Sequence, residues 1–271
     1  MRAAWLIVAI GCSGPQAVDH PGDGNGGGDD GTAGEGPPQL VDDDLDGLDD
    51  RVEQQLAEGY LPFVSLDPND GCPLDGFLVR VRPHPADATK VLIVYDHLLQ
   101  RDCGLGGHVG DDEVFGVAID PARSAPDGIL AIKTASHQGT ICERDSECST
   151  CGDGRTQCDR ALDNSAMWPV LYASKDKHGQ YAVKSACSTF GTCFDQCTLS
   201  ATRRIAPVTN AGEPDHPLVH DLTDQGFITA ANGWTEAALQ HVDPWAPGDF
   251  GGAGAIADDL IDSAFEVGLC P

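Results

Sequence analysis

The stretch that organises the chain is Asp102-Cys-Gly-Leu-Gly-Gly-His108-Val-Gly-Asp111-Asp-Glu113, in which a histidine and two carboxylates follow a glycine-rich approach. The apolar residues that come next, up to Ile119, predict a strand that starts at Asp111. Because side chains alternate along a strand, Asp111 and Glu113 would share one face, and His108 would lie in the loop just before it. One imidazole and two carboxylates that converge suit a divalent metal ion. The alternative is a solvated acidic turn.

Segments with alternating or β-branched apolar residues lie on both sides of this motif and predict further strands. The predicted strands are residues 76–82, 90–99, 113–119, 128–136, 168–174 and 180–185. Helical spacing of apolar residues occurs toward the two ends, at residues 49–59, 234–242 and 253–267. We therefore expect a mainly β fold, either an antiparallel β-sandwich or a large twisted sheet, with peripheral helices.

The chain is strongly acidic, with 43 Asp and Glu against 16 Lys and Arg and a formal net charge of −27 over 271 residues. Non-specific binding to nucleic acid or to anionic lipid depends on Lys and Arg that contact phosphates, so neither is expected. Cation binding is favoured instead.

The N-terminal residues 1–12, MRAAWLIVAIGC, are typical of a bacterial lipoprotein signal peptide. Arg2 provides the positive start, an apolar run follows, and Ala-Ile-Gly-Cys resembles a lipobox in which Cys12 would be lipidated. The run is too short to span a bilayer. We expect an exported protein that a lipid anchor holds at the cell envelope, on the periplasmic side or at the cell surface. The alternative is an ordinary secretory signal.

Residues 13–41 are rich in Gly, Asp and Pro and have almost no large apolar side chains. Such a segment cannot bury enough surface to fold, so it is predicted to be a disordered acidic tether. It would hold the main domain, residues 54–271, away from a membrane.

Residues 42–53, DDDLDGLDDRVE, fit the twelve-residue calcium loop of EF-hands. Carboxylates occupy positions 1, 3, 5, 9 and 12, and a backbone carbonyl would serve at position 7. The residues at these positions are Asp42, Asp44, Asp46, Asp50, Glu53 and Leu48. Gly47 at position 6 permits the sharp turn. No helix is evident before the loop, so we expect a solitary calcium site; the alternative is a disordered acidic run.

Ten cysteines remain once Cys12 is set aside as a lipidation site. They are Cys72, Cys103, Cys142, Cys148, Cys151, Cys158, Cys187, Cys193, Cys197 and Cys270. An even number in an exported chain predicts up to five disulfides, whose pairing the sequence does not define. Four of these cysteines fall in residues 140–164, predicted to be a polar, disulfide-stapled loop without a core of its own. A zinc site at Cys148-x-x-Cys151 is the alternative.

The order of the motifs resembles that of a known family. Gly-Gly-His108-Val-Gly-Asp111-Asp-Glu113 resembles the G-H-x-x-D-W-E motif of the necrosis-inducing (Nep-like) protein superfamily. It is nearer still to the G-H-E-G-D-W-E motif of the vacuolar-protein-sorting "sixty-two" branch. Further similar segments are Ser136-His137-x-Gly139, Trp168-Pro-Val-Leu-Tyr-Ala-Ser-x-x-x-His178-Gly, Asp243-Pro-Trp245 and Phe250-Gly-Gly252. A departure is Asp112, which stands in place of the motif's Trp.

This resemblance implies a β-sandwich with a divalent cation, Ca²⁺ or Mg²⁺, at the motif. The positions that match the family's metal site are Asp102, His108, Asp111 and Glu113. His137 and His178 would line the same cavity. The family's cytolysins use this site to engage the head groups of plant membrane sphingolipids.

Three functions are compatible with these features. The first is a surface-anchored, metal-dependent binding domain for a lipid head group or a glycan, which we favour. The second is a metal-dependent hydrolase in which His137 or His178 would be the general base; a structural hydrogen-bonded histidine is the alternative reading of each. The third is a structural envelope protein that calcium and disulfides only stabilise.

Overall fold

The computed structural model describes residues 40–72, 74–104, 106–187, 194–216, 218, 244–245, 260–261 and 265–270. The signal peptide with Cys12, nearly all of the tether, Cys193 and the helix expected at 234–242 lie outside these residues. Among the residues that the structure describes, no helix is long and apolar enough to cross a membrane.

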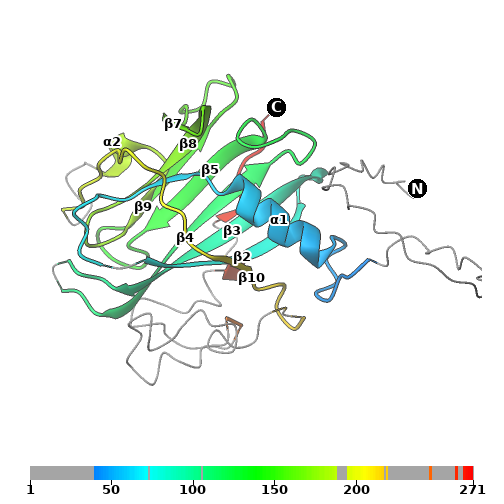
Figure 1. The fold of residues 1–271 in the computed structure, drawn as a ribbon, viewed down its shortest axis with the longest axis horizontal. Helices are drawn as coiled ribbons and strands as arrows, with labels where there is room; N and C mark the ends of the chain where they lie inside the picture. Colours follow the sequence, from blue (N-terminus) through cyan, green and yellow to red (C-terminus); the bar gives the residue numbers. More distant parts are fainter. Residues whose placement is uncertain are drawn as a thin grey trace, which may run out of the picture. The chain divides into compact units, whose positions relative to one another are not determined.

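The larger of two β-sheets has six strands in the order β10-β2-β3-β4-β5-β6 (Figure 1). Their bounds are β2 (Leu74–His84), β3 (Asp87–Arg101), β4 (Val109–Ile119), β5 (Ile129–Ser136), β6 (Arg144–Ser149) and β10 (Val208–Asn210). Strands β2 to β6 form an antiparallel meander, whereas β10 pairs with β2 in parallel. The predicted strands at 76–82, 90–99, 113–119 and 128–136 are thus the central part of this sheet.

The second sheet has four strands in the order β1-β8-β7, with β9 also paired to β8. Their bounds are β1 (Phe63–Ser65), β7 (Arg160–Asp163), β8 (Ala166–Ala173) and β9 (Gln180–Tyr181). The helices are α1 (Asp50–Tyr60) and α2 (Lys184–Cys187). The predicted fold class is confirmed: the protein is mainly β, with two sheets, few helices and disulfide-bonded loops. The pairs β1–β8 and β10–β2 are parallel and depart from a purely antiparallel arrangement.

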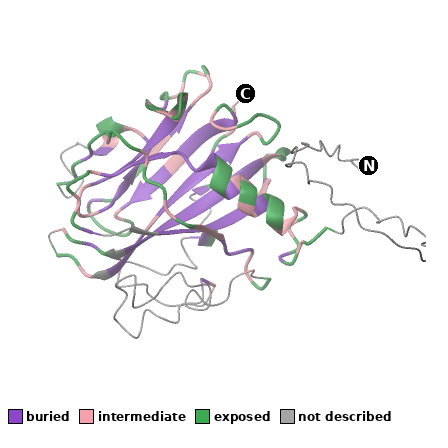
Figure 2. Ribbon diagram, viewed as in Figure 1, coloured by how far each residue is buried: buried purple, intermediate pink, exposed green. Residues whose placement is uncertain are grey.

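Both faces of the six-stranded sheet are covered, so its central strands are buried along most of their length (Figure 2). One face packs Tyr95 and Phe115, whose rings stack at 4.8 Å, against β1, β8 and α1. The other face packs Val114 and its neighbours against Phe265 and Val267 near the C-terminus. A Cβ on Gly116 would lie 2.6 Å from the backbone oxygen of Phe265, so the C-terminal segment can approach β4 only because glycine stands there.

Helix α1 is shifted by one residue from the predicted 49–59, and Gly59, expected to cap its end, lies within it. The carboxylate of Asp49 accepts a hydrogen bond from the backbone N–H of Arg51 and caps the N-terminus. The helix stops at Tyr60, two residues before Pro62, which cannot continue it. The hydroxyl of buried Tyr95 donates to the backbone oxygen of Ala57 and fastens the helix to the larger sheet at 2.8 Å.

The structure pairs eight of the ten cysteines, as Cys72–Cys103, Cys148–Cys158, Cys151–Cys270 and Cys187–Cys197. Cys142 is disulfide-bonded too. The alternative of a zinc site at Cys148-x-x-Cys151 is therefore wrong, because both sulfurs are already bonded.

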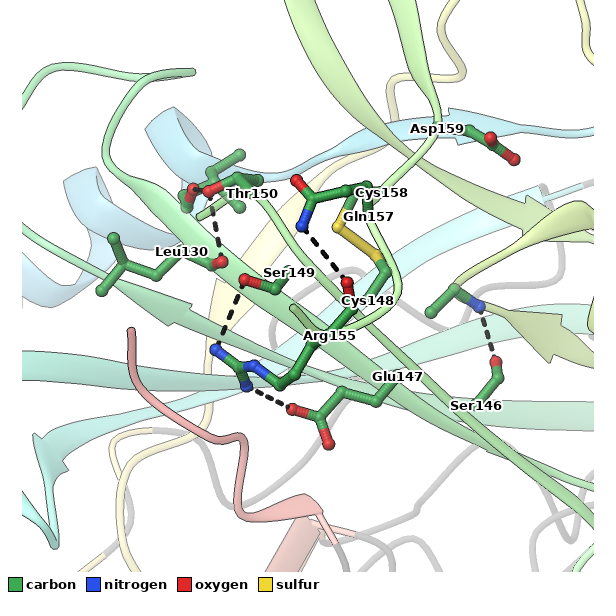
Figure 3. The surroundings of a disulfide bond; sticks show 12 residues. Leu130, Ser146, Glu147, Cys148, Ser149, Thr150, Arg155, Gln157, Cys158 and Asp159 are labelled. Carbon is green, nitrogen blue, oxygen red and sulfur yellow. Dashed lines mark hydrogen bonds and ion pairs between the residues drawn. A yellow bond between two sulfur atoms is a disulfide. The ribbon is translucent and has the colours of Figure 1, made fainter. Parts of the chain in front are cut away.

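Arg155 reinforces the attachment of the C-terminal segment to β6. Its guanidinium donates to Glu147 and Ser149 beside the Cys148–Cys158 bond (Figure 3) and also to the backbone oxygens of Gly268 and Leu269. Together with Cys151–Cys270, these contacts hold the end of the chain on the larger sheet.

Three sequence-based expectations need correction. Residues 140–164 are not a loop without a core, since they contain β6 and β7, and Cys148 is fully buried. The strand predicted at 180–185 ends at Tyr181, and α2 follows. The helix predicted at 253–267 does not reach Val267: of the residues described there, Leu260 and Ile261 are helical, whereas Glu266 and Val267 are not. Strand β6, RDSECS, has no apolar pattern and exists because its backbone pairs with β5.

Phe115→Ala is expected to lower the free energy of unfolding by about 3–5 kcal/mol, because it removes a fully buried ring and leaves a cavity. Denaturant unfolding of the disulfide-bonded protein measures this change. Leu162→Ala is the control. Leu162 is 65% exposed, so truncating its side chain should lower the free energy of unfolding by no more than about 0.5 kcal/mol. Equal costs at the two positions would contradict this packing.

Candidate functional site

A cavity of about 190 Å³ lies beside the first residues of β4. Its charged and imidazole side chains come from the β3–β4 loop, β4, the segment after β5 and the β8–β9 turn. They are Asp102, His108, Asp111, Asp112, Glu113, His137 and Lys177. The pairing of β4 with β5 starts only at Phe115. This leaves room for the cavity next to residues 111–114.

Five of the residues expected from the sequence thus line one cavity: Asp102, His108, Asp111, Glu113 and His137. Glu113 lies opposite His97 and Asp111 opposite Leu99 on β3, in the alternation expected for residues of one face. The sixth, His178, is not among the lining residues. It is completely buried and lies behind Asp111.

His178 forms ion pairs through both ring nitrogens. Nδ1 lies 2.8 Å from Asp111 Oδ2, and Nε2 lies 3.4 Å from Asp70 Oδ2. Burial by itself would lower the pKa of His178, but hydrogen bonds and charge attraction from Asp111 and Asp70 outweigh it and raise this pKa to about 9. His178 is therefore an imidazolium at neutral pH, and it compensates part of the negative charge on this side of the cavity.

The loops around His178 are tied to one another. Asp176 donates its backbone N–H to Asp70 Oδ2 at 2.8 Å and accepts the backbone N–H of Cys103 at 2.7 Å. The Cys72–Cys103 disulfide joins the β1–β2 loop covalently to the β3–β4 loop. The loops after β1, β3 and β8 therefore form one rigid wall of the site.

The two histidines that line the cavity each have one nitrogen engaged by an acceptor. His108 Nδ1 donates to the backbone oxygen of Gly110 at 2.6 Å, and His137 Nε2 lies 2.8 Å from Asp195 Oδ2. Since a carbonyl or a carboxylate only accepts, these nitrogens carry the hydrogen. When the rings are neutral, His108 Nε2 and His137 Nδ1 are then the acceptor atoms.

Asp195 is a site residue that no sequence motif indicated. Its buried carboxylate also accepts the hydroxyl of Tyr181 at 2.6 Å. A Cβ at Gly179 would lie 2.6 Å from Asp195 Oδ2 and 3.2 Å from His137 Nε2, so glycine is required for the pair to form. The contact joins residues 58 positions apart in sequence, which is why the sequence did not reveal it.

The motif residues line the cavity without converging on a single point. Among the described residues, three groups place ligand atoms within 4.8 Å of one another, and Asp102, His108, Asp111 and Glu113 form none of them. One group is Asp70, Cys72 and His178, but the sulfur of Cys72 is in a disulfide. The other two groups both lie in residues 42–53.

The predicted calcium loop brings its five carboxylates together in two overlapping groups that share Asp44. The groups are Asp42, Asp44 and Asp50, and Asp44, Asp46 and Glu53. Gly47 adopts φ +96°, as the sharp turn at position 6 requires.

Two of these carboxylates are buried: Asp44 is 3% exposed and Glu53 0% exposed. Within the described part of the chain, no hydrogen bond reaches either oxygen of Asp44 or Oε1 of Glu53. Burial, and then the nearby charge of Asp46, raise the pKa of Asp44 to about 7 and that of Glu53 to about 9. Buried, unpartnered oxygens in this loop geometry fit a hard divalent cation such as Ca²⁺.

No protein-family model and no curated protein matches the chain. Among solved structures it is similar to a triple mutant of NLPPya, with 14% identity and a TM-score of 0.33 over 56% of this chain and 69% of that one. NLPPya in complex with glucosamine shows 13% identity and a TM-score of 0.33 over 58% and 73%. A structure described as a toxin fold for microbial attack and plant defence shows 16% identity and a TM-score of 0.28 over 56% and 65%.

His178→Asn is expected to destabilise the protein less at high pH than at neutral pH. The pKa of His178 rises from 6.5 to about 9 on folding. The charged ring therefore stabilises the folded protein fully below pH 6.5, and this stabilisation is lost as the pH rises through 9. The difference in unfolding free energy between wild type and variant should shrink by about 3 kcal/mol between pH 6 and pH 10. Denaturant titrations across this range measure it.

The control is His216→Asn, which removes an exposed imidazole. Its unfolding free energy should follow that of the wild type at every pH. A difference between wild type and His178→Asn that stays constant or grows with pH would show that His178 is not held as an imidazolium.

Proposed function

We propose that the protein is an exported calcium-binding protein whose acidic cavity binds a cation and, through it, a polar ligand such as a lipid head group or a glycan. The observation that carries this proposal is the single cavity in which four carboxylates and two histidines are gathered. Carboxylates and neutral imidazole nitrogens are acceptors and metal ligands, so the cavity suits a cation or a ligand rich in N–H and O–H groups.

The distances in the cavity favour a hydrated ion over a fully coordinated one. The motif residues do not converge within 4.8 Å, whereas water can bridge an ion to more distant carboxylates. Mg²⁺ and Ca²⁺ both retain water in such sites. Water ligands can be replaced by the hydroxyls of a head group or a sugar, which gives the cation a direct part in ligand binding.

The calcium loop supports a structural role for a second ion. It supplies carboxylates at all five expected positions, and Ca²⁺ there would relieve the repulsion among them. Four disulfide bonds among the described residues are typical of exported proteins. Attachment to a membrane through lipidated Cys12 belongs to this proposal and rests on residues 1–12.

One observation favours a metal-dependent hydrolase as a second candidate. Asp195 orients His137 at the cavity, as a carboxylate orients a general base. His178 is less suited to that role, because both of its nitrogens are engaged and it does not line the cavity. A hydrolase would lose its activity in His137→Gln while keeping its calcium affinity.

Calcium titration tests the two cation sites separately. In the full chain carrying Cys12→Ser, Glu53→Gln should lower the affinity of the loop site at least about tenfold, because a ligand charge is lost. Glu113→Gln should weaken only the cavity site. Isothermal titration with Ca²⁺ and Mg²⁺ measures both. Asp43→Asn, at the exposed position 2 of the loop, is the control and should leave both affinities unchanged.

Ligand chemistry is tested with glucosamine and N-acetylglucosamine, which differ in the positive charge of the amine. If the acidic lining selects positive charge, glucosamine should bind more tightly, and Glu113→Gln should reduce its affinity about tenfold. Glu58→Gln, at an exposed position on α1, is the control. Equal binding of both sugars by the wild type and by Glu113→Gln would remove the role proposed for these carboxylates.

A further inference from the structure

The calcium loop is in contact with a strand from the other half of the sequence. Glu53, the last residue of the loop, lies in the first turn of α1 and is completely buried. Its Oε2 accepts a hydrogen bond of 2.5 Å from Nδ2 of Asn210, the last residue of β10. Among the described residues, its other oxygen, Oε1, has no hydrogen-bond partner, and Glu53 forms a group of carboxylates with Asp44 and Asp46.

Asn210 is held so that its amide presents a donor to Glu53. Its Oδ1 accepts the backbone N–H of Gly212 at 3.2 Å, which leaves Nδ2 for the carboxylate. Gln54, next to Glu53 on α1, donates to the backbone oxygen of Val208 at 2.8 Å and accepts the backbone N–H of Asn210 at 3.0 Å. Two successive residues of α1, Glu53 and Gln54, thus form hydrogen bonds to β10.

Strand β10 is short and lies at the edge of the sheet among the described residues. It has three residues and pairs with β2 in parallel. Just beyond it, the backbone N–H of Ala211 donates to Val79 at 2.7 Å, and Glu213 pairs with Arg80.

We propose that Asn210 is a positioning residue of the calcium site, and that calcium binding and the docking of β10 on the sheet edge stabilise each other. This inference rests on the calcium site proposed above and adds a residue from outside the twelve-residue loop. Asn210 holds Glu53 through Oε2 and leaves Oε1 for the ion, as an outer residue orients a metal ligand.

The coupling has a physical cause. A Ca²⁺ bound through the Glu53 carboxylate would fix that side chain in place, and the same carboxylate accepts the Asn210 amide through Oε2. Ordering Glu53 therefore orders the end of β10, and an anchored Asn210 in turn holds Glu53 ready for the ion. Thermodynamic linkage makes this coupling reciprocal: the free energy by which calcium stabilises the docking of β10 equals the free energy by which docked β10 strengthens calcium binding.

The test combines calcium titration with hydrogen exchange of the backbone amides of residues 208–211 in the full chain carrying Cys12→Ser. In the wild type, saturating Ca²⁺ should slow the exchange of these amides about tenfold or more. Asn210→Ala should lower calcium affinity about tenfold, the low end for an outer residue that orients a ligand. In that variant, Ca²⁺ should no longer change the exchange of these amides.

Asn69→Ala is the matched control, because Asn69 is an exposed asparagine on the β1–β2 loop. It should retain wild-type calcium affinity and calcium-dependent exchange. If Asn210→Ala does not fold, the test is the hydrogen exchange of the wild-type protein measured with and without Ca²⁺. Protection of the amides of residues 208–211 that Ca²⁺ does not change would overturn the inference.

The outcomes separate this inference from the proposed function. A wild type that binds no Ca²⁺ at a Glu53-dependent site contradicts the calcium site itself. A wild type that binds Ca²⁺ there, with Asn210→Ala within twofold of its affinity, leaves the calcium site intact and overturns only the role of Asn210. A merely structural asparagine would change stability without changing the calcium dependence of exchange.

Discussion

A buried imidazolium between two carboxylates holds the cavity wall together. His178 is fully enclosed, and only the attraction of Asp70 and Asp111 keeps it charged. The three groups come from the β1–β2 loop, β4 and the β8–β9 turn, so the ion pairs determine how these segments meet. Removing one partner from such a cluster leaves a buried charge without compensation, which costs several kcal/mol. The geometry of the cavity therefore depends on this cluster more than on any lining residue outside it.

The excess of acidic residues explains much of the architecture. The chain has 43 Asp and Glu but only 16 Lys and Arg, so most carboxylates cannot be paired with a basic side chain. Where the fold supplies a cation, the arrangement is rigid: Arg155 joins Glu147 and Asp153 and fixes the C-terminal segment. Elsewhere, carboxylates are gathered in the loop at 42–53 and at the cavity, where His178 and Lys177 offset part of their charge. Both places suit a metal ion, because carboxylates shielded from water favour a nearby cation.

Several strands and one helix whose residues carry a clear local pattern were predicted correctly from the sequence. The strands at 76–82, 90–99, 113–119 and 128–136 carry dense β-branched and aromatic residues, and each is a strand in the structure. The helix after the loop begins at an Asp cap and ends before a proline, within one residue of the prediction. Strand β6 was missed because polar residues form it through backbone pairing alone. The strand expected at 180–185 was too long, since Ala182 and Val183 form a bend and α2 starts at Lys184.

The sequence by itself determined the fold class, the sharp turn at Gly47 in the acidic loop 42–53, and the set of residues around His108 that line one cavity. Each of these depends on spacing along a few consecutive residues, which the chain carries directly. Only the tertiary structure decided the disulfide pairing, the burial of His178 behind the cavity lining, and the contacts Asp195–His137 and Asn210–Glu53. Those contacts join residues 58 and 157 positions apart. They form because sheet pairing and burial bring distant segments together, and no local pattern encodes that.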